Sequence, residues 1–184
     1  MSKQKKIFTL IFLVLVLTLS LLPFLVSINE GLTKVVERNL LYEGIQKFIV
    51  PIEAKMMGVI LIFFGHSFTF YPGASMILVN GTFMGITWNC IGWQSFILLL
   101  ITFLAGFGLK YTKRSVAEAS AIGILGTFWV NILRMLVTVL LAVYFPPVFR
   151  IVFHTYLAAG VSIAWLVFFW WFSYKYVLTE KQIV

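Results

Sequence analysis

The stretch CIGWQSFILLLITFLAGFGLKYTKR, residues 90–114, joins an apolar run of about 20 residues to a cluster of basic side chains. A helix of that length crosses the hydrocarbon core of a bilayer, which is about 30 Å thick. Basic residues gather on the cytoplasmic side of membrane spans. The stretch therefore predicts a transmembrane helix that starts outside at Cys90 and ends inside at Lys110, Lys113 and Arg114.

The composition of the whole chain also indicates a membrane protein. Of the 184 residues, 61% are hydrophobic and 11% are charged, far from the mix of a water-soluble domain. The 14 Lys and Arg against 6 acidic residues, all of them Glu, give a net charge of +8. Because the basic residues stand at the ends of apolar runs, they indicate membrane topology rather than nucleic-acid binding. We expect a single integral membrane domain over residues 1–184.

The segments before this stretch extend the prediction. Residues 7–26 follow a basic N-terminus and predict a retained anchor helix, because the run is long and no small-x-small cleavage site closes it. Residues 27–66 are expected to form an interfacial region. Within it, residues 27–50 have the charged and apolar spacing of an amphipathic helix, and residues 56–64 either span the bilayer or only dip into it.

Residues 67–88 have a different pattern. Tyr71-Pro72-Gly73 and Asn80-Gly81 are turn signals, and short β-prone runs lie at 76–79 and 82–87. We expect a small β-hairpin outside the bilayer core.

Residues 89–174 are expected to form a helical core. After the span that ends at the basic cluster, a helix begins near Val116 and returns outward past Arg134 until Pro146-Pro147 ends it, and the last helix begins at His154. The predicted fold class is an all-α multi-span membrane protein with four or five transmembrane helices, an extracytoplasmic interfacial helix and a small β-hairpin.

The topology has two solutions. If all five apolar segments cross and the N-terminus is inside, the basic cluster is forced outside. Either residues 56–64 do not cross, or the N-terminus is outside. Both solutions leave Cys90, Arg134 and His154 on the extracytoplasmic side.

Arg134 is a charged residue within an apolar helix. Such a charge costs about 2.5 to 3.5 kcal/mol at the bilayer centre, so it needs the interface, a partner or a wet cavity. Glu118, the nearest acid on that helix, lies about 24 Å away along the axis. We therefore expect Arg134 either to bind an anion or a developing negative charge, or to snorkel to the interface.

Cys90 is the single cysteine, placed where a loop meets a helix, and a helix N-terminus favours the reactive thiolate. His154 is expected on the same face, and an imidazole is the usual base for a thiol. The alternative for Cys90 is a small buried apolar residue. His66 lacks this placement and is expected to be structural. One Cys, two His and no Asp are a poor ligand set, so we expect neither a metal nor a cofactor.

Three short motifs follow one another in this chain: Asn89-Cys90-Ile91-Gly92, Asn131-Ile132-Leu133-Arg134 and Phe153-His154. In these motifs the chain resembles the exosortase and archaeosortase family of membrane transpeptidases. The signature of that family is a Cys followed by Gly at a helix start, an Asn-x-x-Arg on the next helix and a His that opens the last. The resemblance covers roughly residues 79–171. The chain departs from many members at Ile91, where they have a small polar residue.

The resemblance implies cleavage of a C-terminal sorting signal with an apolar tail from secreted proteins, through a thioester at the cysteine. The protein is then transferred to a lipid or surface acceptor in the cell membrane. By the same resemblance, Cys90, Arg134 and His154 are the catalytic residues. The supporting residues are Asn89, Gly92 and Asn131.

Two functions without catalysis remain open. A non-enzymatic membrane scaffold or small channel subunit would use Arg134 and His154 only to satisfy one another's polar surroundings. A small transporter would bind an anion at Arg134, although Gly and Pro breaks are not arranged in matching halves.

Overall fold

The computed structural model describes residues 41–86, 90–108 and 110–181. The chain divides into two compact units, Met1–Tyr42 and Glu43–Val184. The second unit contains nearly all of the described residues, and the fold below is that of this unit.

Helix α2 (Leu41–Phe63) is continuous through Pro51, although separate segments were expected on either side of this residue. Proline has no N–H to donate to the carbonyl one turn earlier, here that of Lys47, yet the helix does not end there. The expected anchor helix at residues 7–26 and the expected interfacial segment at residues 27–40 lie outside the described residues.

One face of α2 is buried. Residues three or four apart share a face of a helix, and the most deeply buried positions follow this spacing. They are Val50, Glu53, Ala54, Met57 and Leu61, each 0 or 1% exposed. Glu53 is thus a charged residue type within an otherwise apolar stripe.

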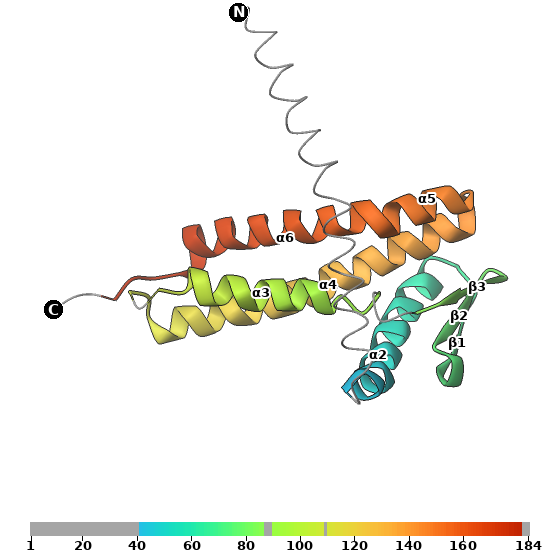
Figure 1. The fold of residues 1–184 in the computed structure, drawn as a ribbon, viewed down its shortest axis with the longest axis horizontal. Coiled ribbons are helices and arrows are strands. Elements are labelled where there is room, and N and C mark those ends of the chain that lie inside the picture. Colours follow the sequence, from blue (N-terminus) through green and yellow to red (C-terminus); the bar gives the residue numbers. More distant parts are fainter. Residues whose placement is uncertain (1–40, 87–89, 109, 182–184) are drawn as a thin grey trace, which may run out of the picture. The chain divides into compact units, whose positions relative to one another are not determined.

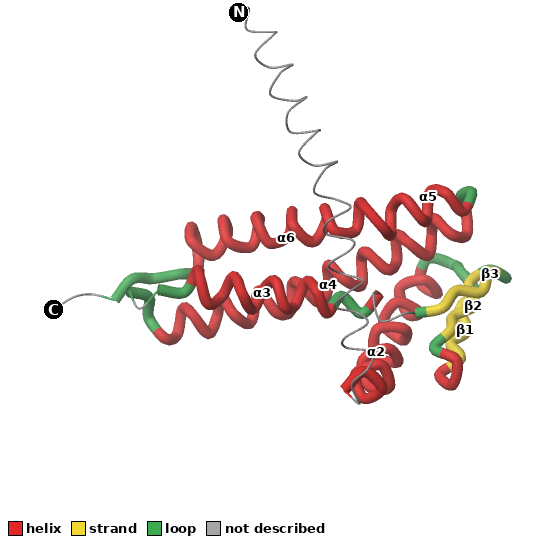
Figure 2. The backbone as a smooth tube through the Cα atoms, in the orientation of Figure 1, coloured by secondary structure: helices red, strands yellow, loops and turns green. Residues whose placement is uncertain are grey.

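A three-stranded antiparallel sheet follows α2 (Figure 2). Its strands, in spatial order, are β1 (Phe68–Tyr71), β2 (Met76–Val79) and β3 (Thr82–Gly85). Asn80 and Gly81 join β2 to β3 with φ angles of 45° and 83°, as a two-residue hairpin loop requires. The hairpin expected within residues 67–88 is therefore part of a larger sheet, because β1 pairs with β2 and was not expected.

The other helices pack along one another (Figure 1). The long ones are α3 (Trp93–Gly106), α4 (Lys113–Tyr144) and α6 (Ala158–Phe172). The short α5 (Pro147–Val152) leads through a π-helical turn, η3 (Phe153–Leu157), into α6, and a second π-helical turn, η4 (Ser173–Val177), follows.

The core between these helices is rich in aromatic side chains. Leu99 of α3 is buried together with Leu166 and Phe169 of α6. Gly123 of α4 faces this cluster, since a Cβ there would lie 2.8 Å from Cζ of Phe103 and 3.0 Å from Cζ of Phe169. A small residue at this position therefore lets α3 and α6 approach the backbone of α4.

Helix α4 is, in the described part of the chain, the one helix that is long and apolar enough to cross a membrane. It has 32 residues. Helix α3 has 14 residues, which at 1.5 Å each reach about 21 Å, short of a bilayer core of about 30 Å. Helix α6 has 15 residues, and α2 carries Lys47, Glu53 and Lys55.

The expected fold class, an all-α protein with four or five transmembrane helices, is therefore wrong. The described residues form five helices, one of them a candidate span, and a small antiparallel sheet.

The ends of α3 explain why the sequence was misleading. Gly92 has a φ angle of 73°, so the helix starts only at Trp93, and it ends at Gly106. The apolar run from Cys90 to Gly108 is thus longer than the helix within it. Hydropathy indicates which residues avoid water, but it does not indicate where the backbone leaves the helical conformation.

Candidate functional site

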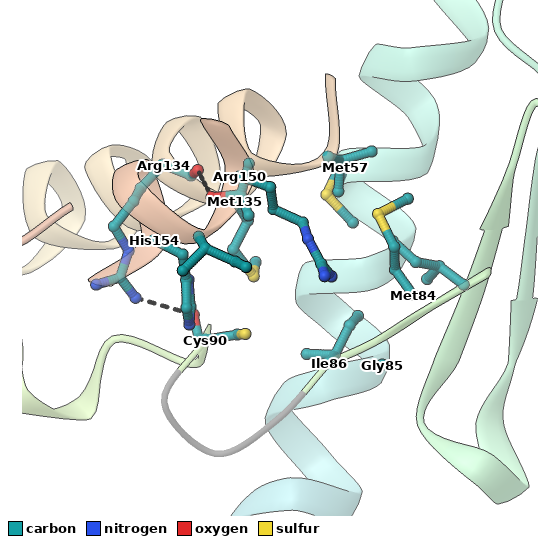
Figure 3. Close-up of a pocket in the computed structure, with 13 residues that line it drawn as sticks. Met57, Met84, Gly85, Ile86, Cys90, Arg134, Met135, Arg150 and His154 are labelled. Atoms are coloured by element: carbon teal, nitrogen blue, oxygen red, sulfur yellow. Dashed lines mark hydrogen bonds between the residues drawn. The ribbon is translucent and has the colours of Figure 1, made fainter. Parts of the chain in front are cut away.

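A cavity of about 280 Å³ lies between α2, the sheet, α4 and the segment from α5 to η3 (Figure 3). Cys90, Arg134 and His154, the three residues that the motifs single out, all line it. Most of the remaining wall is apolar, with Met57 of α2 and Met84 of β3 among its side chains. The structure therefore brings the three residues to one place from distant parts of the chain.

Cys90 lies in the segment that leads from the sheet into α3. Its carbonyl oxygen accepts hydrogen bonds from Nδ2 of Asn131 at 3.1 Å and from Nη2 of Arg134 at 3.2 Å. Its sulfur points toward the middle of the cavity (Figure 3). Helix α4 thus holds the backbone of Cys90 while the sulfur faces the cavity.

Gly92, at the N-terminal end of α3, touches the side chain of Asn131. Its φ of 73° and ψ of 17° lie in the left-handed region that favours glycine. A Cβ at this position would collide with Oδ1 and Cγ of Asn131. Gly92 therefore supplies both the turn into α3 and the space for the amide. Asn89, another expected supporting residue, lies outside the described residues.

Arg134 is buried, with 8% of its surface exposed, and it does not snorkel. Its own helix has no acid near it, but Glu53 of α2 is close enough for the two charges to interact. Glu53 is fully buried, and its Oε1 accepts a hydrogen bond of 2.8 Å from Nδ2 of Asn131. An acid from another helix therefore belongs to the site.

Burial raises the pKa of Glu53 to about 8, although the hydrogen bond from Asn131 and the charge of Arg134 act in the opposite direction. Its second oxygen, Oε2, has no hydrogen-bond partner among the described residues, so little compensates the charged form for the loss of water. The carboxyl group is therefore mostly protonated at neutral pH. In that state Glu53 itself carries no negative charge that would offset the positive charge of Arg134.

His154 lies inside the π-helical turn η3, between α5 and α6, and does not open a helix as expected. Single π-turns within α-helices are frequent at functional sites. Burial lowers the pKa of His154, and the positive charges of Arg134 and Arg150 lower it further. The ring is therefore neutral at pH 7, which is the form that accepts a proton.

Arg150 of α5 is a cavity residue that the sequence motifs do not include. Its guanidinium group points into the cavity (Figure 3). None of the described residues that line the cavity is acidic. Two guanidinium groups and apolar walls therefore make a cavity suited to a negatively charged or partly apolar group.

His66 lies away from the cavity. Its Nδ1 is 3.0 Å from Nδ2 of Asn80 and 3.2 Å from the hydroxyl of Tyr144. It thus links the sheet to the end of α4, which is a structural role. Among the described residues there is no group of three His, Cys, Asp or Glu side chains that could hold a metal ion.

No protein-family model matches the chain, and no curated protein and no solved structure matches it. The resemblance to exosortases and archaeosortases therefore rests on the three motifs.

Proposed function

We propose that this protein is a membrane-bound cysteine transpeptidase of the exosortase and archaeosortase type. It would cleave a C-terminal sorting signal from secreted proteins and transfer each protein to a lipid or surface acceptor. The observation that carries the proposal is the meeting of Cys90, Arg134 and His154 at one cavity. A thiol, a neutral imidazole and a guanidinium are the groups that acyl transfer through a thioester needs.

In the first step, the thiol of Cys90 gives its proton to the neutral ring of His154, and the sulfur bonds to the scissile carbonyl carbon. The guanidinium of Arg134 stabilises the oxyanion that forms. When the oxyanion collapses, the C–N bond breaks and His154 returns the proton to the leaving amine. The secreted protein is then a thioester on Cys90.

In the second step, an amine or hydroxyl of the acceptor attacks the thioester carbonyl and gives its proton to His154. The C–S bond breaks, and the sulfur of Cys90 takes the proton back from the ring. Water in place of the acceptor gives hydrolysis. The acceptor that reaches the cavity therefore decides between transfer and cleavage.

Helix α4 supports the placement of this chemistry at a membrane surface. Lys113 begins the helix, and Arg134 lies about 30 Å further along it, close to the thickness of a bilayer core. Large apolar side chains on α4 face outward, with Leu125 61%, Trp129 52% and Leu133 54% exposed. We place α4 across the cell membrane, with its basic end in the cytoplasm and the cavity at the extracytoplasmic face.

Expression with candidate secreted substrates that carry an apolar C-terminal tail tests this function. The wild-type protein should shorten such a substrate and form a hydroxylamine-sensitive adduct at Cys90. The Cys90→Ala protein should insert into the membrane normally and do neither. Sequencing the C-terminus of the trapped adduct would identify the cut. Normal processing by Cys90→Ala would contradict the mechanism.

A non-enzymatic scaffold is the second candidate, and one observation favours it. Arg134 and Asn131 both bind the carbonyl oxygen of Cys90, which is also what a purely structural contact requires. Alkylation of Cys90 distinguishes the two functions. A rate that falls in His154→Gln supports the catalytic pair, whereas equal rates in the wild-type and His154→Gln proteins support the scaffold.

A further inference from the structure

Glu53 takes no part in the chemistry proposed above, yet it is hydrogen-bonded to Asn131, which in turn holds the backbone of Cys90. Its Oε1 lies 2.8 Å from Nδ2 of Asn131, and the same nitrogen lies 3.1 Å from the carbonyl oxygen of Cys90. A side-chain amide nitrogen carries two hydrogens. Both hydrogens of Asn131 are therefore used, one on α2 and one on the segment before α3.

The position of Glu53 is an unfavourable one for a carboxyl group. The residue is 0% exposed within an apolar stripe, and its Oε2 has no partner among the described residues. Burying such a group costs free energy that an apolar side chain on the same face would not. Packing alone therefore does not explain an acid at this position.

The hydrogen bond to Glu53 also determines the orientation of the Asn131 amide. Oε1 of Glu53 accepts a hydrogen bond from the nitrogen end of the amide, as does the backbone carbonyl oxygen of Cys90, which has no hydrogen to donate. With that end fixed, the nitrogen also faces the carbonyl oxygen of Cys90. If the amide turned over, Oδ1 of Asn131 would face the carbonyl oxygen of Cys90, and the hydrogen bond between the two residues would be lost.

We propose that Glu53 is a positioning residue of the site, which acts on the backbone of Cys90 through the amide of Asn131. Its catalytic meaning rests on the proposed function, but the coupling of the three residues can be measured without any substrate. Removal of the acceptor at position 53 takes away the contact that fixes the nitrogen end of the Asn131 amide, so the hydrogen bond from Asn131 to the Cys90 carbonyl is weakened while that from Arg134 stays. The sulfur is then held less firmly toward the cavity.

Alkylation of the 184-residue chain in membranes measures this coupling, because Cys90 is its single cysteine. Glu53→Gln keeps an oxygen that accepts from Asn131, so a maleimide should label Cys90 at close to the wild-type rate. Glu53→Met has a similar length and no such oxygen. Its labelling rate should fall about tenfold, the scale of one buried hydrogen bond. Equal rates in the two variants would overturn the proposal.

Asn131→Ala should slow labelling as much as Glu53→Met does. The double variant should be no slower than Asn131→Ala, because the two residues act along one path. Losses that simply multiply would show that they act separately and would overturn the proposal. Glu118→Gln is the matched control, since Glu118 is an exposed acid paired with Arg114 on α4, and its labelling rate should not change.

Glu53→Asp supplies the comparison if the Met variant does not fold. It keeps the carboxyl but withdraws it by one methylene from Asn131, so labelling should again be slow, and a wild-type rate would overturn the proposal. Substrate processing separates the two proposals. If the labelling rates are as predicted but neither the wild-type protein nor any variant cleaves the substrate, the proposed function alone is contradicted. If Glu53→Met cleaves the substrate and is labelled at wild-type rates, the positioning role alone is contradicted.

Discussion

Arg134 donates from Nη2 to the carbonyl oxygen of Cys90 across 3.2 Å, so its guanidinium is tied to the backbone beside the sulfur that it is proposed to serve. A guanidinium carries five N–H groups in a planar fork, and it can therefore hold a backbone oxygen and face a cavity at the same time. The fold then sets where the positive charge of Arg134 lies relative to the sulfur of Cys90, and so relative to a substrate carbonyl that the sulfur would attack.

Replacing Arg134 with lysine tests this double use. Lysine keeps the charge but lacks the planar fork, so processing of a secreted substrate should fall by about 100-fold or more, the scale of one lost oxyanion donor. The measurement is the rate of substrate shortening by Arg134→Lys. Arg114→Lys, at an exposed ion pair with Glu118, is the control. Wild-type processing by Arg134→Lys would mean that only the charge is needed.

Gly92→Ala should damage the site and the fold together. The new Cβ collides with the amide of Asn131, and alanine is strained at a φ of 73°. We expect a loss of about 1 kcal/mol or more in thermal unfolding, and slower labelling of Cys90. Gly160→Ala is the control, because a Cβ there meets no atom within 4 Å and alanine favours a helix. Equal stability of the two variants would show that position 92 does not require glycine.

Glu53 should make the stability of the protein fall as the pH rises. Its pKa in the folded chain is about 8 against an ordinary value of 4.5. Between these values the folded state binds more protons than the unfolded state, so the free energy of unfolding decreases with pH. The charge of Arg134 acts on Glu53, and Glu53 is not among the causes of the His154 shift. We therefore expect His154 to contribute equally to the pH dependence in the wild-type and Glu53→Gln proteins.

Glu53→Gln removes this dependence, so at pH 9 the variant should be more stable than the wild-type protein, and the difference should shrink toward pH 5. Thermal unfolding in detergent at both pH values measures it. Parallel curves for the two proteins would show that Glu53 does not titrate in this window.

Arg150→Gln should raise the pKa of His154, because the charge of Arg150 is one of the causes that lower it. The pH dependence of the His154 ring signal in NMR measures this shift. The chain has two histidines, so a His66→Gln background leaves one signal. Lys113→Gln, at the N-terminal end of α4 and far from the cavity, should leave the midpoint of the His154 titration unchanged. A midpoint that does not move with Arg150→Gln would show that this charge does not reach the ring.

Local sequence patterns specify some elements of the fold and leave others open. The Asn80-Gly81 turn predicts the β2–β3 hairpin, and Pro146-Pro147 marks the end of α4. The number of spans could not be predicted in this way, because a single glycine with positive φ, Gly92, shortens the helix within an apolar run. Strand β1 was missed, although the turn signal Tyr71-Pro72-Gly73 leads from it into β2, because its four residues are the shortest run in which strand alternation can be recognised.

The candidate site was predictable where it depends on motifs and not where it depends on packing. Glu53 does carry a signal, because it falls at helical spacing between Val50 and Met57 on an apolar face. Its partner Asn131 lies 78 residues away in the sequence. Which residue meets an acid on α2 is decided by how α2 packs against α4, and no local pattern contains that information.

The π-helical turn η3 contains one residue more than an α-helical turn would, and α5, η3 and α6 follow one another without a break. An additional residue rotates everything after it by about 100° about the axis. A single rod can thereby aim His154 at the cavity while Leu166 and Phe169 face the aromatic core. Deleting one residue after His154 would turn the π-helical turn into an α-helical one. The continuous helix could then no longer direct His154 into the cavity and also keep Leu166 and Phe169 in the aromatic core.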